Sequence, residues 1–153
     1  MVITNNEKRF EDSFSAIQTE WVELGLDYVP DADKIFLYGS CENNMYFFNE
    51  FFMIDGIVVR KHQVNINGSR SYDVSVTRQK ALIKYSIEEL MKMHELFKEY
   101  NREMPTEIKL IYDVKKGSLE GDYSYELKHS NTKDLTADDF FDKWFEEIKS
   151  KYN

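Results

Sequence analysis

The spacing of apolar residues changes period several times along this chain, and the order of those changes is what most limits the fold. Near the amino terminus, apolar side chains recur three or four residues apart, which is the spacing of one face of an α-helix. They are Phe10, Phe14, Ile17, Trp21 and Leu24. We expect this first helix to cover residues 6–24, with Asn5 or Asn6 as its N-cap and Gly25 as its end.

Three segments rich in β-branched and aromatic residues follow, separated by short turns. The first covers residues 34–39 and the second residues 45–53, with residues 41–44 as the turn between them. Asp55-Gly56 is a second turn signal, and it leads into residues 57–64. This arrangement predicts a three-stranded antiparallel meander.

The helical period returns after Ser75, which is placed to cap a long helix over residues 76–102. Ser86 begins a capping-box pattern of its own and is an alternative start. One face of this segment is apolar, and Met104-Pro105 ends it. The residues of that face are Ile83, Ile87, Leu90, His94 and Phe97.

The last third of the chain predicts a hairpin and then a helix. Residues 107–113 and 121–127 alternate at period two and are joined through Lys116-Gly117. Thr136 opens a second capping box, followed by a helix with one apolar side. That side consists of Phe141, Trp144, Phe145, Ile148 and Tyr152.

The whole chain, residues 1–153, therefore predicts a single α+β domain with the order α-β-β-β-α-β-β-α. We expect the helices to pack against one face of an antiparallel sheet. The apolar stripe of each element supplies the predicted core. Its main members are Phe14, Trp21, Leu37, Phe47, Leu90, Phe97 and Leu110.

Charge is distributed unevenly. The chain has 20 basic and 28 acidic residues, a formal net charge of −8. This balance argues against nucleic-acid binding, which requires clustered Lys and Arg, and favours encounter with a basic partner. Residues 7–33 carry eight acidic and two basic groups, residues 56–85 six basic and one acidic, and residues 120–153 nine acidic and five basic. The basic middle either meets the acidic ends within the fold or forms a patch of its own.

Neither a membrane segment nor a leader is evident. No apolar run is long enough to span a bilayer, and the residues after Met1 lack a basic region followed by an apolar one. Cys41 is the only cysteine, so no intrachain disulfide can form. These features predict a soluble, cytoplasmic protein.

The residues that usually carry catalysis or bind metals are not grouped in the sequence. His62, His94 and His129 are far apart and have no ligand-spaced partner. His94 is expected to be a core histidine, and the other two are expected at the surface. Ser40 follows Gly39 but lacks the second glycine of a nucleophile elbow. We therefore expect no metal, no cofactor and no enzymatic activity.

The predicted second hairpin has the composition of an interface. Tyr123 and Tyr125 share one strand face, and Glu120, Asp122 and Glu126 lie beside them. Aromatic anchors next to charged groups are common at protein interfaces. An ordinary half-buried sheet would present the same residue types, so the pattern leaves both interpretations open.

The order and spacing of short motifs over residues 28–127 resembles the YezG-like family of bacterial immunity proteins. The matching stretches are Val29-Pro30, Lys34-Ile-Phe-Leu-Tyr38, Tyr46-Phe47-Phe48, Tyr72-Asp-Val-Ser75, Ala81-Leu82, residues 89–97, Pro105-Thr106 and Gly121-Asp-Tyr-Ser-Tyr-Glu126. Two tryptophans of the family pattern are absent: Ala32-Asp33 stands in place of one, and the other is missing near Pro105. A sister immunity family is therefore a second interpretation.

Members of that family are antitoxins that neutralise secreted toxins, typically nucleases. The resemblance implies that the partner is a cognate toxin domain, bound so that its active site is covered. From the resemblance and the acidic carboxy-terminal third we predict eight contact residues, in a monomer or weak homodimer. They are Glu120, Asp122, Tyr123, Tyr125, Glu126, Asp138, Asp142 and Trp144. The alternative function is a small-molecule binding or enzymatic domain with a pocket between sheet and helices.

Overall fold

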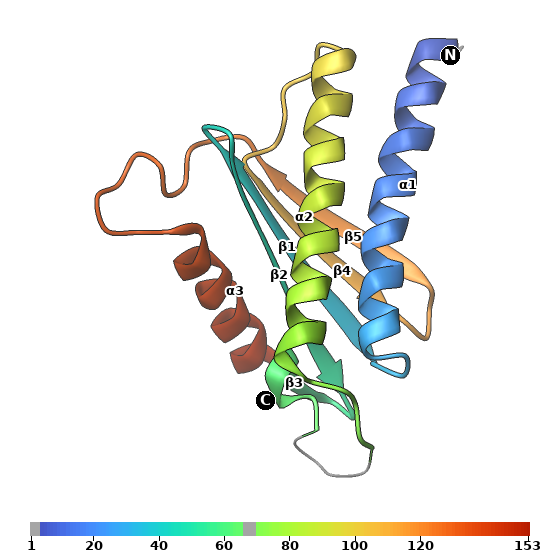
Figure 1. The fold of residues 1–153 in the computed structure, drawn as a ribbon, viewed down its shortest axis with the longest axis vertical. Helices are drawn as coiled ribbons and strands as arrows, with labels where there is room; N and C mark the ends of the chain where they lie inside the picture. The colour runs from blue at the N-terminus through green and yellow to red at the C-terminus, as the bar shows by residue number, and fades with distance from the viewer. Residues whose placement is uncertain (1–3, 66–69) are drawn as a thin grey trace.

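The computed structural model describes residues 4–65 and 70–153 of the chain (Figure 1). The elements follow the predicted order of an α+β fold. They are α1 (Asn5–Tyr28), β1 (Lys34–Glu42), β2 (Met45–Ile54), β3 (Ile57–Arg60), the short 3₁₀ helix η1 (Lys61–Gln63), α2 (Val76–Glu99), β4 (Glu107–Asp113), β5 (Ser118–Ser124) and α3 (Ala137–Tyr152).

The five strands form one antiparallel sheet in the order β3-β2-β1-β4-β5. The meander β1-β2-β3 and the hairpin β4-β5 are joined by the pairing of β1 with β4. Phe36, for example, lies opposite Phe51 of β2 on one side and Ile111 of β4 on the other. β1 is therefore the central strand, hydrogen-bonded along both edges.

Helices cover both faces of this sheet, so the prediction that they all pack on one face is wrong. In Figure 1, α1 and α2 lie on one side of the sheet and α3 on the other. Alternation along β1 places Ile35 and Leu37 in the cluster with α1 and α2, and Phe36 and Tyr38 in the cluster with α3. The physical reason is that β1 is apolar without interruption over residues 35–38. A strand of this kind is buried on both sides, and each side needs a cover.

The core predictions hold for most positions. Five of the seven predicted core residues are buried, and Phe14 and Phe47 are half-buried. Phe14 packs in the cluster that α1 and α2 form with the sheet, whereas Phe47 packs beneath α3. Trp21 is fully buried, and its indole Nε1 donates a hydrogen bond to the Ser86 carbonyl at 2.9 Å. This bond ties α1 to α2 above the sheet.

The first helix is longer than predicted at both ends. Thr4 is its N-cap and forms a capping box with Glu7, so the helix includes Asn5 and Asn6. Gly25 does not end it. A Cβ added at Gly25 would lie 2.9 Å from the Ile35 Cγ2 atom, so this glycine lets α1 lie close against β1.

The remaining boundaries differ from the predictions by a few residues. Ser75 caps α2 as predicted, and the helix runs through Ser86 without a break, but it ends at Glu99 rather than at residue 102. The third strand stops at Arg60 and η1 begins at Lys61. β5 covers residues 118–124 instead of 121–127. The Thr136 capping box is present at the start of α3.

Candidate functional site

The predicted contact residues of the second hairpin occupy different environments. Tyr123 is half-buried: its ring centroid lies 6.0 Å from that of Phe14, and its hydroxyl accepts a hydrogen bond from the side-chain amide of Gln18. Tyr125 lies beyond the end of β5 and is 50% exposed. Tyr123 therefore packs against the core, and Tyr125 is the more exposed aromatic residue of this pair. Both line a hollow of about 430 Å³ beside Phe14.

The acidic residues of the hairpin are at the surface. Glu120 and Asp122 are exposed on the edge strand β5. Glu126 is also exposed and lies 3.7 Å from the Lys128 ammonium. All three carboxylates are accessible to solvent.

The predicted residues of α3 are also separated by their surroundings. Trp144 is only 5% exposed and packs edge-on against Phe36 and Phe51, so it is a core residue rather than an exposed anchor. Asp142 accepts a hydrogen bond from Arg60 at 2.7 Å. Asp138 is exposed at the start of the helix. The eight residues thus do not converge on one surface.

A groove between α1 and α2 holds a denser group of acidic residues. The two helices lie side by side and run in opposite directions (Figure 1). The groove between them has a volume of about 790 Å³. Its acidic lining residues are Glu20 from α1 and Glu88, Glu89, Glu95 and Glu99 from α2.

Apolar side chains line the groove among these glutamates. Ile17 and Leu96 are each 8% exposed, while Met91 is 46% exposed. The small residues Ser13 and Ala16 line it on the α1 side. The groove therefore combines an apolar surface with carboxylates, a combination that suits a basic polypeptide.

Lys92 is the only basic residue that lines the groove among the described residues. Its ammonium donates a hydrogen bond to Glu89 at 2.8 Å. This bond and the charge of Glu89 raise the pKa of Lys92, and the charges of Glu20 and Glu88 add to the effect. The field in the groove is therefore negative even beside its own lysine.

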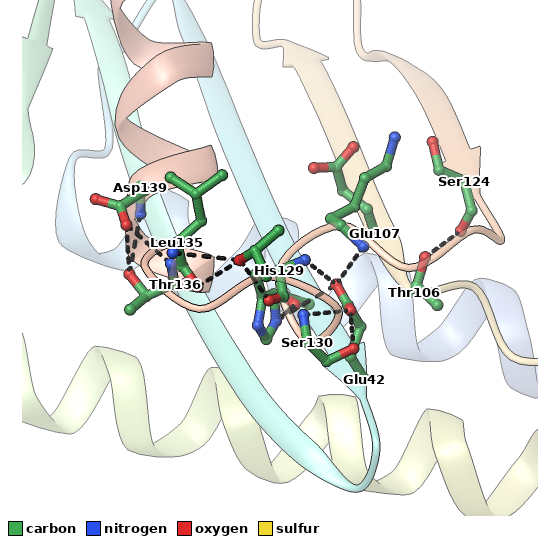
Figure 2. Close-up of polar contacts among 12 residues, drawn as sticks. Glu42, Thr106, Glu107, Ser124, His129, Ser130, Leu135, Thr136 and Asp139 are labelled. Atoms are coloured by element: carbon green, nitrogen blue, oxygen red, sulfur yellow. Dashed lines mark hydrogen bonds and ion pairs between the residues drawn. The ribbon is translucent and has the colours of Figure 1, made fainter.

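A second hollow lies between the β1–β2 turn and the segment that leads to α3. Glu42, at the end of β1, anchors this segment (Figure 2). Its carboxylate accepts hydrogen bonds from the backbone N–H groups of residues 128–130 at 3.1–3.3 Å, and from the Ser130 hydroxyl at 2.6 Å. Burial alone would raise the pKa of Glu42, but these bonds together outweigh it and lower that pKa.

The resulting cleft has a volume of about 510 Å³. Ser40 and His129 both line it and are both buried, so the expectation of a surface position for His129 is wrong. The Ser40 Oγ atom lies 3.3 Å from His129 Nε2, and a Glu42 carboxylate oxygen lies 3.4 Å from the same nitrogen. A Ser–His–acid relay needs the serine and the acid on opposite ring nitrogens, so this arrangement is not a relay.

His94 has the satisfied, partly buried environment that is expected of a core histidine. The Tyr46 hydroxyl lies 2.6 Å from His94 Nδ1, and the thiol of Cys41 lies 3.8 Å from the same atom. Burial and the nearby charge of Lys98 lower the pKa of His94. Across residues 4–65 and 70–153, no three His, Cys, Asp or Glu side chains come together in a way that could hold a metal ion.

Neither hollow could be predicted from the sequence, and the reason is the same for both. In the sequence, the glutamates of the groove look like those of a solvated helix face, because the tertiary fold decides which helix lies beside α2. Likewise, Glu42 and His129 are 87 positions apart and meet only because β1 ends beside the segment before α3. The glutamate spacing on α2, with Glu88, Glu95 and Glu99 on one side, was the one available signal.

No protein-family model and no curated protein matches this chain. The resemblance to the YezG-like family therefore stays a prediction. Within the described part of the chain, no helix has both the length and the apolar character needed to cross a bilayer.

Proposed function

We propose that this protein is an immunity protein that binds a toxin domain and covers its basic, nucleic-acid-binding surface. The observation that carries the proposal is the groove between α1 and α2, where five glutamates and one lysine surround apolar side chains. The order of motifs along residues 28–127 supports a toxin as the partner. The proposal moves the contact surface from the carboxy-terminal hairpin to the first helix pair.

The physical mechanism is electrostatic attraction followed by occlusion. A nuclease presents Lys and Arg side chains where nucleic-acid phosphates bind. Carboxylates arranged along a groove take the place of those phosphates and speed the encounter. Apolar contacts at the centre then slow dissociation, because they are desolvated in the complex.

The test compares two variants with the same change in charge. One variant neutralises the groove, and the other neutralises the surface predicted from the sequence. The groove variant carries Glu20→Gln, Glu88→Gln, Glu95→Gln and Glu99→Gln. The matched control carries Asp122→Asn, Glu126→Gln, Asp138→Asn and Asp142→Asn.

The binding partner in this test is a nuclease toxin domain, which the proposal expects in a neighbouring gene. Its association with each protein is measured at low and high salt. We expect the groove variant to associate roughly tenfold more slowly at low ionic strength, with a flatter salt dependence. The association rate of the control variant should stay closer to that of the wild-type protein. If the control variant instead associates more slowly than the groove variant, the contact surface lies on the hairpin and α3. Absence of binding by the folded wild-type protein at about 10 μM would contradict the proposed function.

The cleft beside His129 favours a second candidate function, the binding of a small polar ligand. Buried Ser40 and His129 and the apolar side chains of Phe47 and Leu135 line one preformed hollow. Such sites combine apolar walls with a few fixed polar groups. His129→Ala would weaken the binding of a ligand in this cleft and leave toxin association through the groove unchanged.

A further inference from the structure

We propose that the groove between α1 and α2 binds an amphipathic basic helix of the partner, about three turns long. This inference rests on the proposed function and adds the shape of the partner segment. It depends on the spacing of the lining residues, on their size and on the extent of the acidic stretch.

The lining residues follow helical spacing on both walls. On α1, Ser13, Ala16 and Glu20 are separated by three and four residues. On α2, Glu88 and Glu99 mark the two ends of the lining, eleven residues apart. Two neighbouring helices of this kind leave a straight groove parallel to their axes. A third helix can lie along it, which is a common mode of peptide recognition.

The sizes of the side chains favour close approach. Ser13 and Ala16 are small and exposed on the α1 wall. On the α2 wall, Met91 offers an exposed apolar side chain that can adapt to the partner. The backbone of a docking helix can therefore come near α1, with its apolar residues against Ile17 and Met91.

The acidic stretch sets the length and charge of the partner segment. From Glu88 to Glu99, α2 spans about 16 Å, or three helical turns. Beyond Glu99, Arg9 and Arg102 line the surface together with Glu7, so the charge there is no longer predominantly acidic. A partner helix therefore needs its Lys or Arg residues within these three turns, on the two sides of its apolar stripe.

The probe is a synthetic 14-residue peptide with Leu at helical spacing and Lys on both flanks. A scrambled peptide of identical composition, with the helical spacing removed, is the control. We expect the amphipathic peptide to gain helical circular dichroism on binding and to shift backbone amide resonances of α1 and α2. The scrambled peptide should bind at least about tenfold more weakly.

A protein variant tests the groove without changing any charge. Ala16→Leu fills the groove and should weaken binding of the amphipathic peptide by about tenfold or more. Ser15→Leu, on the same helix but outside the groove lining, should leave that binding unchanged. Both substitutions place a good helix former in a helix, so the fold is retained. Equal affinity for both peptides, or no effect of Ala16→Leu, would overturn the helix inference. Toxin binding that still depends on the groove glutamates would then leave the proposed function standing.

Discussion

The two faces of the sheet are covered in different ways. Two helices of 24 residues each, α1 and α2, cover one face with a mixed aliphatic and aromatic core. A single helix of 16 residues, α3, covers the other over a smaller cluster that is mostly aromatic. Since stability follows buried apolar area, the α3 layer is expected to open more easily than the rest.

Each face also contains a buried carboxylate, and the two are stabilised by different partners. Glu50 faces α1 and α2, where it pairs with the Lys61 ammonium at 3.0 Å while its second carboxylate oxygen has no hydrogen-bond partner among the described residues. Glu42 lies on the α3 face and accepts hydrogen bonds from backbone N–H groups. Burial raises the pKa of Glu50 despite Lys61, whereas hydrogen bonding lowers that of Glu42.

The largest expected effects come from truncating one aromatic residue on each face. Phe97→Ala and Trp144→Ala should each cost about 3–5 kcal/mol, because both side chains are buried. Native-state amide exchange should show Phe97→Ala weakening protection throughout the chain. Trp144→Ala should weaken it mainly in α3. Equal loss of protection in every element of the Trp144→Ala protein would mean that the two faces unfold as one unit.

The sequence was sufficient for the features that are set locally. The element order and the caps at Ser75 and Thr136 are confirmed, because a cap depends on residues three positions apart. The cover on the second face was missed, although the uninterrupted apolar run in β1 indicated it. Periodicity tells which side of a helix is apolar but not which sheet face receives it.

The candidate site was less predictable because its residues meet through tertiary packing. Tyr125 is exposed as an interface residue should be, but Trp144 belongs to the core. Both are aromatic residues close to charged neighbours in the sequence, so local composition does not separate them. Only packing on Phe36 and Phe51 decides that Trp144 is covered. In the same way, the groove exists because α1 lies beside α2, which no local pattern specifies.

The second prediction concerns the carboxylate on the larger face. Lys61→Met should cost roughly 3 kcal/mol at about pH 8, because it leaves the Glu50 carboxylate buried without its cation. The pKa of Glu50 already lies above its ordinary value, and losing Lys61 raises it further. The variant should therefore be most stable below the unfolded-state pKa of glutamate. It should lose stability as pH rises through the folded-state pKa.

Denaturant unfolding at several pH values, from roughly pH 5 to roughly pH 8, measures this dependence. The double variant Lys61→Met with Glu50→Gln is the control, because a neutral amide has no ionisation to suppress. Its stability should vary less with pH than that of the single variant. A deficit in the Lys61→Met protein that stays constant over the whole range would show that lost packing, rather than the unpaired charge, is the cause.

The smallest expected effect tests the carboxylate on the α3 face. Glu42→Gln keeps the shape of the side chain but replaces one accepting oxygen with an amide that faces N–H donors. The free energy of unfolding should fall by about 1–3 kcal/mol near neutral pH. Because the folded-state pKa of Glu42 is lowered, its contribution is present above the unfolded-state pKa and is lost as pH falls through the folded-state value.

Wild type and the Glu42→Gln protein should therefore converge in acid, because wild type loses stability there. The direction is opposite to that at the other carboxylate, where the Lys61→Met protein loses stability as pH rises. Urea unfolding at stepped pH, together with amide exchange at residues 128–130, measures both the energy and its location. A difference that persists in acid would assign the role of Glu42 to its shape and not to its charge.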